Sequence, residues 1–277
     1  MSRHFKKWVT YLVLFIMPSS CGNILEDTAN KNSDEAILYQ ARMYLSRGDW
    51  TNAITEFNSL TAATLAQTEV KIDLASAYSG RCGLDFITIS LNLQNFNPAS
   101  SQFFAMVLPS VVTTTNSSAD CVTSETILKT IATGGVVNDP VGQFLMAFNS
   151  LAKIAAILNF YGDVDDNGTV DATWDACGAG GLADLPNADL NEIVTGFFLF
   201  IHNIAGLAVG GTLGTNMITQ CEAALGVGNC ATFNTGAVTN AERWFMRGSL
   251  VETTDKIGLA VRAGSTALNA ADPQCQL

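Results

Sequence analysis

A short acidic segment in the second half of the chain has residue types and spacings that could hold a cation. Oxygen-bearing side chains occur at Asp163, Asp165, Asn167 and Asp171, and Gly168 allows a sharp turn between them. Carboxylate and amide oxygens are the ligands that calcium prefers in proteins. A plain Asp/Asn-Gly turn on an acidic surface has a similar composition and is the alternative. We expect bound calcium with a structural role, in which it neutralises clustered carboxylates between two helices.

The same segment resembles the calcium loop shared by EF-hands and dockerin modules. The resemblance departs at loop position 12, where Trp174 replaces the bidentate acid of the family. That acid would come from Asp175 in a bulged loop or from the more distant Asp184. The ligand set that the resemblance implies is Asp163, Asp165, Asn167, Thr169 through its carbonyl, Asp171 and Asp175.

Residues for enzymatic chemistry are few. His202 is the only histidine after the first twenty residues, and it lies in a very apolar stretch, which is more typical of a core residue than of a catalytic base. The chain has no GxSxG, HExxH or phosphate-binding glycine motif. Paired carboxylates of the kind used by sugar hydrolases stay open, because any two of the 25 acidic residues could meet. We expect no catalytic activity.

The first twenty residues have the pattern of a signal peptide. A basic start, with Arg3, Lys6 and Lys7, precedes an apolar run over residues 8–17. That run is too short to span a bilayer as a stable anchor. We therefore expect export and removal of residues 1–20.

The residues that follow resemble the lipobox of bacterial lipoproteins. Ser19 and Ser20 are small residues directly before Cys21, although Pro18 stands where the family prefers leucine. The resemblance implies that Cys21 is lipidated, that residues 21–33 form a tether, and that the protein is anchored in the bacterial outer membrane, facing the periplasm. Ordinary signal cleavage, which would leave a secreted protein, is the alternative.

The cysteine count agrees with lipidation. Seven cysteines is an odd number for an exported protein, and acylation of Cys21 leaves six. An even set in an oxidising compartment indicates three disulfides, and the absence of a CxxC pair disfavours a redox or zinc motif. Fifteen connectivities are open to six cysteines. The pairs we expect are Cys82–Cys121, Cys177–Cys275 and Cys221–Cys230.

The net charge of the chain and its distribution restrict the kinds of partner that it can bind. All 25 acidic residues but only 11 of the 14 basic ones lie beyond residue 20, which gives the mature part a net charge of −14. Lys129 and Lys153 are the only basic residues between Arg81 and Arg243. Nucleic acid is therefore excluded as a partner, since nothing offers a phosphate-binding surface. Contact with the membrane is expected through the anchor alone.

Apolar periodicity and helix-start signals predict an all-α fold with about nine or ten helices. Two series with helical spacing each predict one apolar stripe against a core: Phe144, Phe148, Leu151, Ala155 and Leu158, and Leu190, Ile193, Phe197, Ile201 and Ile204. Predicted starts are Asn32 with Glu35, Asp49, Asp85, Asn97 with Pro98, Asp139 with Pro140, and Thr239 with Glu242, and a further helix is expected near Thr123.

One uncharged stretch has transmembrane length. Residues 193–221 carry no formal charge. His202 and Asn203 lie in the middle of it, however, and four glycines interrupt its second half. A span there would also leave three cysteines on each side, so they could not all pair. We expect a buried core helix followed by a glycine-rich turn.

Residues 34–95 resemble tetratricopeptide repeats, first in the helical pattern of residues 36–60. Ala41 and Tyr44 match the small and aromatic positions of the repeat, and both recur 34 residues later as Ala75 and Tyr78. The turn and second helix match through Gly48, Asp49, Trp50, Ala53 and Phe57. The resemblance implies two helical hairpins that pack on the rest of one disulfide-stapled helical domain, residues 96–277, and a docking role. A plain helical hairpin is the alternative.

Three functions compete on this basis. The first is an envelope-anchored lipoprotein that serves as a non-catalytic docking or scaffold subunit for a protein partner. The second is a lipoprotein that binds an apolar small molecule or lipid in a helical pocket lined by Phe197, Phe198, Phe200 and Trp244. The third, hydrolysis by paired carboxylates, has the least support.

Overall fold

The structure is a computed structural model, and most of the chain that it describes is helical. It describes residues 32–95, 107–111, 118–164, 185–207 and 237–251, together with Phe104, Asp171, Trp174, Thr215, residues 217–219, Glu222 and Cys230. The all-α prediction is confirmed. The helices are α2 (Asp34–Ser46), α3 (Trp50–Ser59), α4 (Ala62–Leu65), α5 (Thr68–Arg81), α6 (Phe86–Asn95), the 3₁₀ helix η2 (Leu108–Ser110), α8 (Ser118–Lys129), α9 (Pro140–Gly162), α11 (Asn187–Ala205) and α13 (Asn240–Val251).

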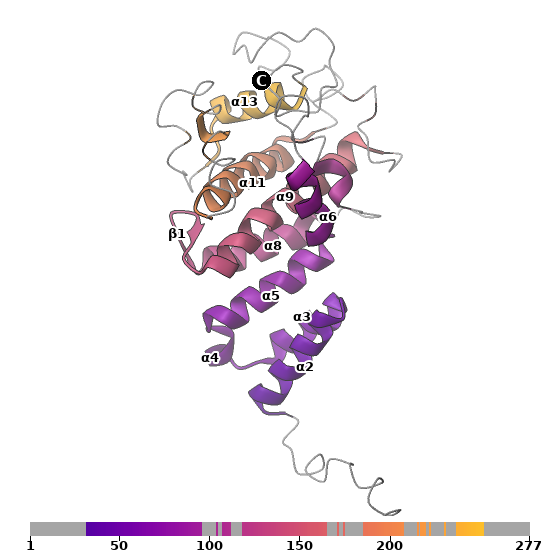
Figure 1. The fold of residues 1–277 in the computed structure, drawn as a ribbon, viewed down its shortest axis with the longest axis vertical. Coiled ribbons are helices and arrows are strands. Elements are labelled where there is room, and N and C mark those ends of the chain that lie inside the picture. Colours follow the sequence, from indigo (N-terminus) through magenta and orange to yellow (C-terminus); the bar gives the residue numbers. More distant parts are fainter. Residues whose placement is uncertain are drawn as a thin grey trace, which may run out of the picture.

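The long helices form an elongated stack in the order of the chain (Figure 1). Helix α2 packs on α3, α3 on α5, α5 on α8, α8 on α9, α9 on α11, and α11 on α13. Alternate helices also touch, α2 with α5 and α5 with α9. Because the contacts run mainly along this series of helices, the architecture is a layered stack that resembles a short solenoid. The α2–α3 hairpin and α13 lie at its opposite ends.

Side-chain caps hold the starts of five of the described helices. The carboxylate of Asp49 accepts one backbone N–H of the first helical turn, and those of Asp85 and Asp139 accept two each, as predicted. Thr239 and Glu242 form the expected reciprocal capping box. The predicted cap at Asn32 is wrong by one residue, since the hydroxyl of Ser33 accepts the Ala36 N–H. Asn97 and Pro98 lie outside the described residues.

The N-terminal hairpin is held by close packing of small residues. Ala41 on α2, Ala53 on α3 and Ala77 on α5 are completely buried around Phe57. At the next contact the indole of Trp50 lies on Gly80 of α5, so closely that a Cβ there would stand 2.6 Å from the ring. A glycine at this position lets the two helices approach.

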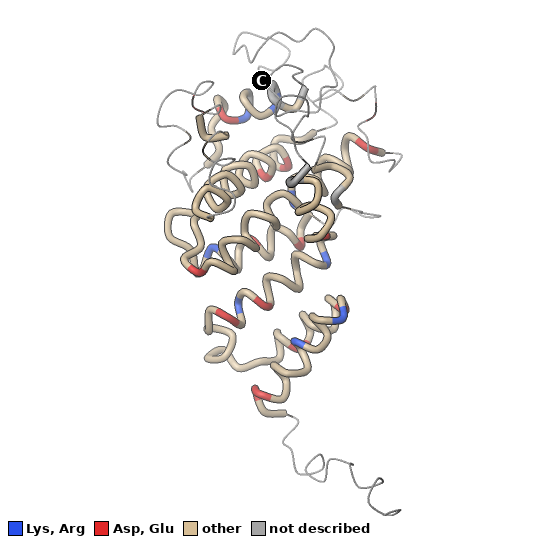
Figure 2. Tube along the Cα trace, in the orientation of Figure 1, with Lys and Arg blue, Asp and Glu red and all other residues tan. Residues whose placement is uncertain are grey.

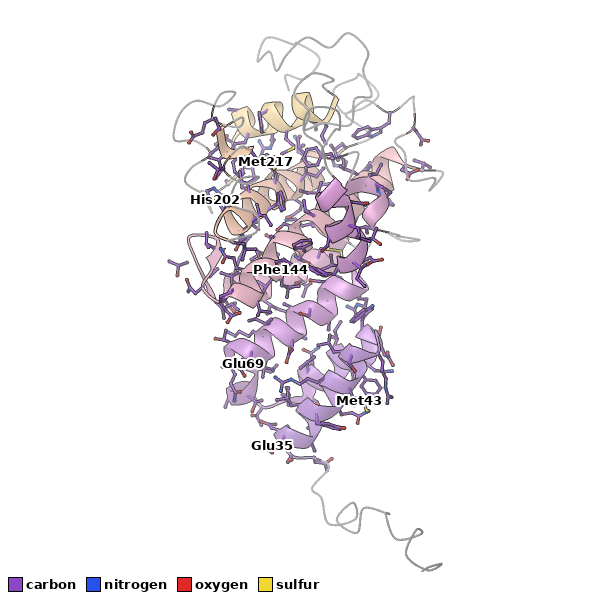
Figure 3. All side chains as sticks on the ribbon, in the orientation of Figure 1. Glu35, Met43, Glu69, Phe144, His202 and Met217 are labelled. Carbon is purple, nitrogen blue, oxygen red and sulfur yellow. A yellow bond between two sulfur atoms is a disulfide. The ribbon has the colours of Figure 1, made fainter. Side chains whose placement is uncertain are left out.

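The second expected hairpin differs from the prediction. The helix that packs along α5 is α8, and not α6. Helix α6 instead packs on η2 and places the ring of Phe86 against Phe144 and Phe148 of α9, with ring centroids 4.8 Å apart in both contacts (Figure 3 labels Phe144). Residues 82–117 are therefore an insertion between the two helices of the second pair. The 34-residue recurrence of Ala75 and Tyr78 does not extend to a second hairpin within residues 68–95.

Helix α9 is buried on all sides through its middle, where the sequence predicted only one apolar stripe. Residues 146–159 are all buried, because α8, α11, α5 and η2 surround the helix. Within the described ranges α9 is the one helix long and apolar enough to cross a membrane by length and composition, and most of it lies inside the fold. An apolar core helix meets the same criteria.

Helix α11 confirms the predicted stripe of Leu190, Ile193, Phe197, Ile201 and Ile204, all of which are buried. It ends at Ala205, before the glycines. Residues 193–207 therefore contain a core helix, as expected, and residues 208–214 lie outside the described part.

A two-stranded hairpin before α9 escaped the sequence prediction. Strands β1 (Ala132–Thr133) and β2 (Val136–Val137) pair around Gly134 and Gly135, which have φ angles of 58° and 83°. The Gly-Gly pair was the available signal, because hairpin turns of this kind need two residues with positive φ. Asn203 of α11 holds the hairpin: its amide donates to the Gly135 carbonyl, and its oxygen accepts the Val137 N–H.

Candidate functional site

The two ends of the loop that follows α9 lie next to each other. The Asp171 N–H donates to the Gly162 carbonyl at 2.6 Å, and the Asp171 carboxylate accepts the Val164 N–H at 3.1 Å. The backbone N–H of Trp174 then donates to the Asp171 carbonyl, and the Trp174 ring lies against Gly162. Residues 163 and 171 are therefore neighbours, although eight positions separate them in the sequence.

Two of the six expected calcium ligands thus come together, Asp163 and Asp171. Asp163 is buried and Asp171 is half-buried. Asp165, Asn167, Thr169 and Asp175 lie outside the described residues, as does Asp184. Within the described positions no group of three or more His, Cys, Asp or Glu side chains is close enough to hold a metal. Calcium binding at this loop therefore stays a prediction.

Calcium is expected to stabilise the wild-type chain and not a loop variant. Millimolar calcium should raise the melting temperature, because an ion at one hundred times its Kd adds about 2.7 kcal/mol to the free energy of unfolding. Asp163→Ala combined with Asp165→Ala should abolish that rise. Thermal melts with calcium and with chelator measure it, and Glu69→Ala, which removes an exposed acid far from the loop, should respond like wild type. A wild-type melting curve that chelation leaves unmoved would mean that the loop is only a turn.

A charged cluster lies at the centre of the stack, where α8, α9 and α11 meet. The Lys153 side chain is fully buried and donates to Glu125, to Glu192 at 2.8 Å and to Thr195 at 3.1 Å. Glu125 is also buried and binds a second lysine, Lys129, one turn away on α8 at 2.5 Å. Lys129 and Lys153 are the only lysine or arginine residues of α8 and α9 (Figure 2 colours such residues blue). Both bind the Glu125 carboxylate.

The cluster controls the ionisation of Glu125. Burial by itself would raise the pKa of this carboxyl, but the charges of Lys153 and Lys129 and their hydrogen bonds outweigh it, so the pKa lies below its ordinary value. Glu125 therefore stays ionised in the fold, and Lys153 keeps a counter-ion inside the core.

A neutral polar layer continues this cluster toward α5. The hydroxyls of Ser79 and Ser124 lie 2.8 Å apart, and Ser79 donates to the Asn149 side-chain oxygen at 2.8 Å. The Asn149 amide donates to the Cys121 carbonyl at 2.9 Å. These groups are buried and mutually satisfied. Together with the charged cluster they fix how α5, α8, α9 and α11 align, which is the role of a structural layer.

The expected disulfide between Cys82 and Cys121 is present, and both cysteines are completely buried. Cys121 lies inside α8, which begins at Ser118, and not before a helix that starts near Thr123 as predicted. Directly beside the disulfide, Arg81 makes two hydrogen bonds of 2.7 Å to Asp120. The end of α5 is thus tied to the start of α8 by a covalent bond and by an ion pair.

Of the remaining cysteines, Cys230 alone lies within the described residues. Cys230 is disulfide-bonded. Its expected partner Cys221 lies outside the described residues, and so do Cys177 and Cys275. Cys21 lies in the segment before residue 32 that the structure does not describe.

The aromatic residues considered as a pocket lie in the core. Phe197 and Phe200 are fully buried, and Phe198 almost so. The ring of Phe197 packs against Phe104 and Phe245, with centroids 6.1 Å and 6.2 Å away. The Trp244 side chain is outside the described part. Phe197, Phe198 and Phe200 therefore fill space between helices.

His202 lies on the side of α11 near the chain that carries Cys230 (Figure 3 labels His202). Burial lowers its pKa, and a hydrogen bond with the Cys230 backbone acts in the opposite direction. A neutral imidazole held by a backbone group is typical of a structural histidine.

Comparisons with known proteins assign this chain to no family. No protein-family model, no curated protein and no solved structure matches the chain.

Proposed function

We propose that this protein is a lipid-anchored docking subunit of a bacterial envelope, without catalytic activity of its own. The observation that carries the proposal is the stack of helices α2, α3, α5, α8, α9, α11 and α13, in which each helix packs on the next one in this series (Figure 1). Architectures of this kind present long side surfaces for their size, and proteins use them chiefly to bind other proteins.

The polar interior supports a rigid scaffold. The charged cluster around Lys153 and the serine-asparagine layer beside it are enclosed between helices, where side chains satisfy one another. Groups that bind substrate would need access from a cleft, whereas Lys153, Ser79 and Asn149 are completely buried. The burial of these residues therefore supports a structural role for them and not a catalytic one.

The anchoring part of the proposal rests on the sequence around Cys21. A basic start, a short apolar run and small residues before the cysteine are the features of a lipoprotein signal. A tether of some twelve residues before α2 could extend about 40 Å. Such a tether would leave the stack free to meet a partner near the membrane.

Substitution of Cys21 tests this anchoring. Cys21→Ala should move the protein out of the membrane fraction, because the acylation site is lost. Cell fractionation and mass spectrometry of the mature protein measure the change, and Tyr39→Ser, at an exposed position of α2, is a control that leaves the anchor in place. A Cys21→Ala protein that stays membrane-bound with unchanged mass would contradict the proposal. Cross-linking in native membranes, followed by affinity purification of the anchored protein, should then recover one defined partner protein.

A further inference from the structure

Helix α6 has apolar residues on both of its faces. Ile89 points into the core and is fully buried. Ile87 and Leu91 lie on the opposite side of the helix and are 69% and 52% exposed. Apolar residues gathered on the outward side of a helix are typical of an interaction site, and Ile87 and Leu91 have no cover within the described fold.

Helix α9 continues this apolar surface. Phe86, the first residue of α6, is 41% exposed and rests on Phe144 and Phe148 of α9. Val141 lies on the same side of α9 as these two rings, one turn before Phe144, and is 65% exposed. The docking surface therefore consists of Phe86, Ile87, Leu91 and Val141, which come from two different helices.

Two carboxylates lie beside this docking surface. Asp85, the N-cap of α6, directly precedes Phe86, and Asp139, the N-cap of α9, lies two residues before Val141. Hydrogen bonds from the Thr88 backbone and hydroxyl lower the pKa of Asp85, so it is ionised at neutral pH. The partial positive charge of each helix N-terminus offsets only about half of a carboxylate. Residues 86–128 contain no lysine or arginine, and Arg81, four residues before Asp85, is bound to Asp120.

We infer that this docking surface binds an amphipathic, cationic segment of a partner protein: a helix with an apolar stripe flanked by lysine or arginine. The apolar stripe would cover Ile87, Leu91 and Val141, and the flanking cations would meet Asp85 and Asp139. A second copy of this chain fits less well, because it would bring the same two carboxylates and a net charge of −14 to a surface that is already negative. The inference rests on the proposed docking function and names the site and the chemistry of its partner.

A designed helix with leucine on one face and lysine on the other provides the probe. Fluorescence anisotropy with the Cys21→Ala chain should give a Kd at least about tenfold weaker for Ile87→Ser combined with Leu91→Ser than for the parent chain. Tyr39→Ser is the matched control, because Tyr39 is exposed on α2 at the far end of the stack. The same helix with glutamate in place of lysine should bind the parent chain at least about tenfold more weakly.

Charge-removing variants test the second half of the inference. Asp85→Asn together with Asp139→Asn keeps two good N-caps and should weaken binding of the lysine helix and reduce its salt dependence. Glu35→Gln with Glu69→Gln, at exposed positions on α2 and α5, removes the same net charge elsewhere and should do neither (Figure 3). Circular-dichroism melts establish that each variant folds. If the double serine variant does not fold, Val141→Ser alone serves, with an expected loss of severalfold in affinity.

Several outcomes would overturn the inference. Equal affinity of the parent and the Ile87/Leu91 variant for the lysine helix would mean that the probe binds elsewhere. Self-association of the parent that this variant abolishes would identify a second copy as the occupant. Binding to phosphatidylcholine vesicles that depends on Ile87 and Leu91 would identify lipid. Native cross-linking separates this inference from the function: a partner captured equally by both forms would leave the docking role intact and reject only the surface.

Discussion

Replacing Glu125 with alanine is expected to lower the free energy of unfolding by about 3–5 kcal/mol. The change leaves Lys153, which is fully buried, without its enclosed counter-ion and with only the half-exposed Glu192 and the Thr195 hydroxyl as partners. A buried charge that loses its partner keeps its desolvation cost and loses the attraction that offset it. Chemical denaturation of the two proteins measures the difference.

The neighbouring lysine offers a matched control. Lys129 binds the same carboxylate, but 39% of its side chain is exposed, so Lys129→Ala should cost less than about 1 kcal/mol. Adding Lys153→Met to Glu125→Ala should recover part of the loss, because no unpaired charge then stays in the core. A loss for Glu125→Ala as small as that for Lys129→Ala would show that Lys153 does not depend on Glu125.

The stabilisation that the Glu125–Lys153 cluster provides should depend on pH. The pKa of Glu125 in the fold lies below its ordinary value, so its contribution to stability is complete above that ordinary value. The contribution is lost as the pH falls through the lowered pKa. Wild type should therefore lose more stability on acidification than the variant that lacks both Glu125 and Lys153.

Removing the Cys82–Cys121 disulfide by a double alanine substitution is expected to cost about 4 kcal/mol. The bond closes a loop with a sequence separation of 39, and its loss frees that loop in the unfolded chain. Denaturation of the double variant measures the loss. Arg81→Ala is the control at the same junction: it removes only the partly exposed ion pair with Asp120, and about 1 kcal/mol or less is expected.

The burial of this disulfide gives a second expected result. Both cysteines are inaccessible in the fold, so a thiol reductant should reach them only after the protein opens. The rate of reduction should therefore follow the rate of unfolding across a denaturant series. Rapid reduction in native buffer, or a double variant as stable as wild type, would contradict the structural role of the bond.

The sequence by itself determined the features that depend on residues close along the chain. Asp49, Asp85 and Asp139 start helices because each carboxylate binds N–H groups only two or three residues away. The Leu190–Ile204 stripe predicted one buried side of α11 correctly, because its spacing follows from the helical period. The Cys82–Cys121 bond was predicted correctly across 39 positions, but one reason for it was wrong, since Cys121 lies inside α8 and not before it.

The tertiary structure alone decided which helices meet and what lies between them. The pattern of α9 predicts one apolar stripe, but α8, α11 and η2 cover the other sides as well. Lys153 looks like a surface residue in sequence, and it becomes a core residue only because Glu125, 28 positions earlier, and Glu192, 39 positions later, meet it there. Likewise α5 pairs with α8 across an inserted segment. Contacts between residues far apart in the sequence depend on how whole helices pack together. The local spacing of apolar residues predicts each helix but not its packing partners.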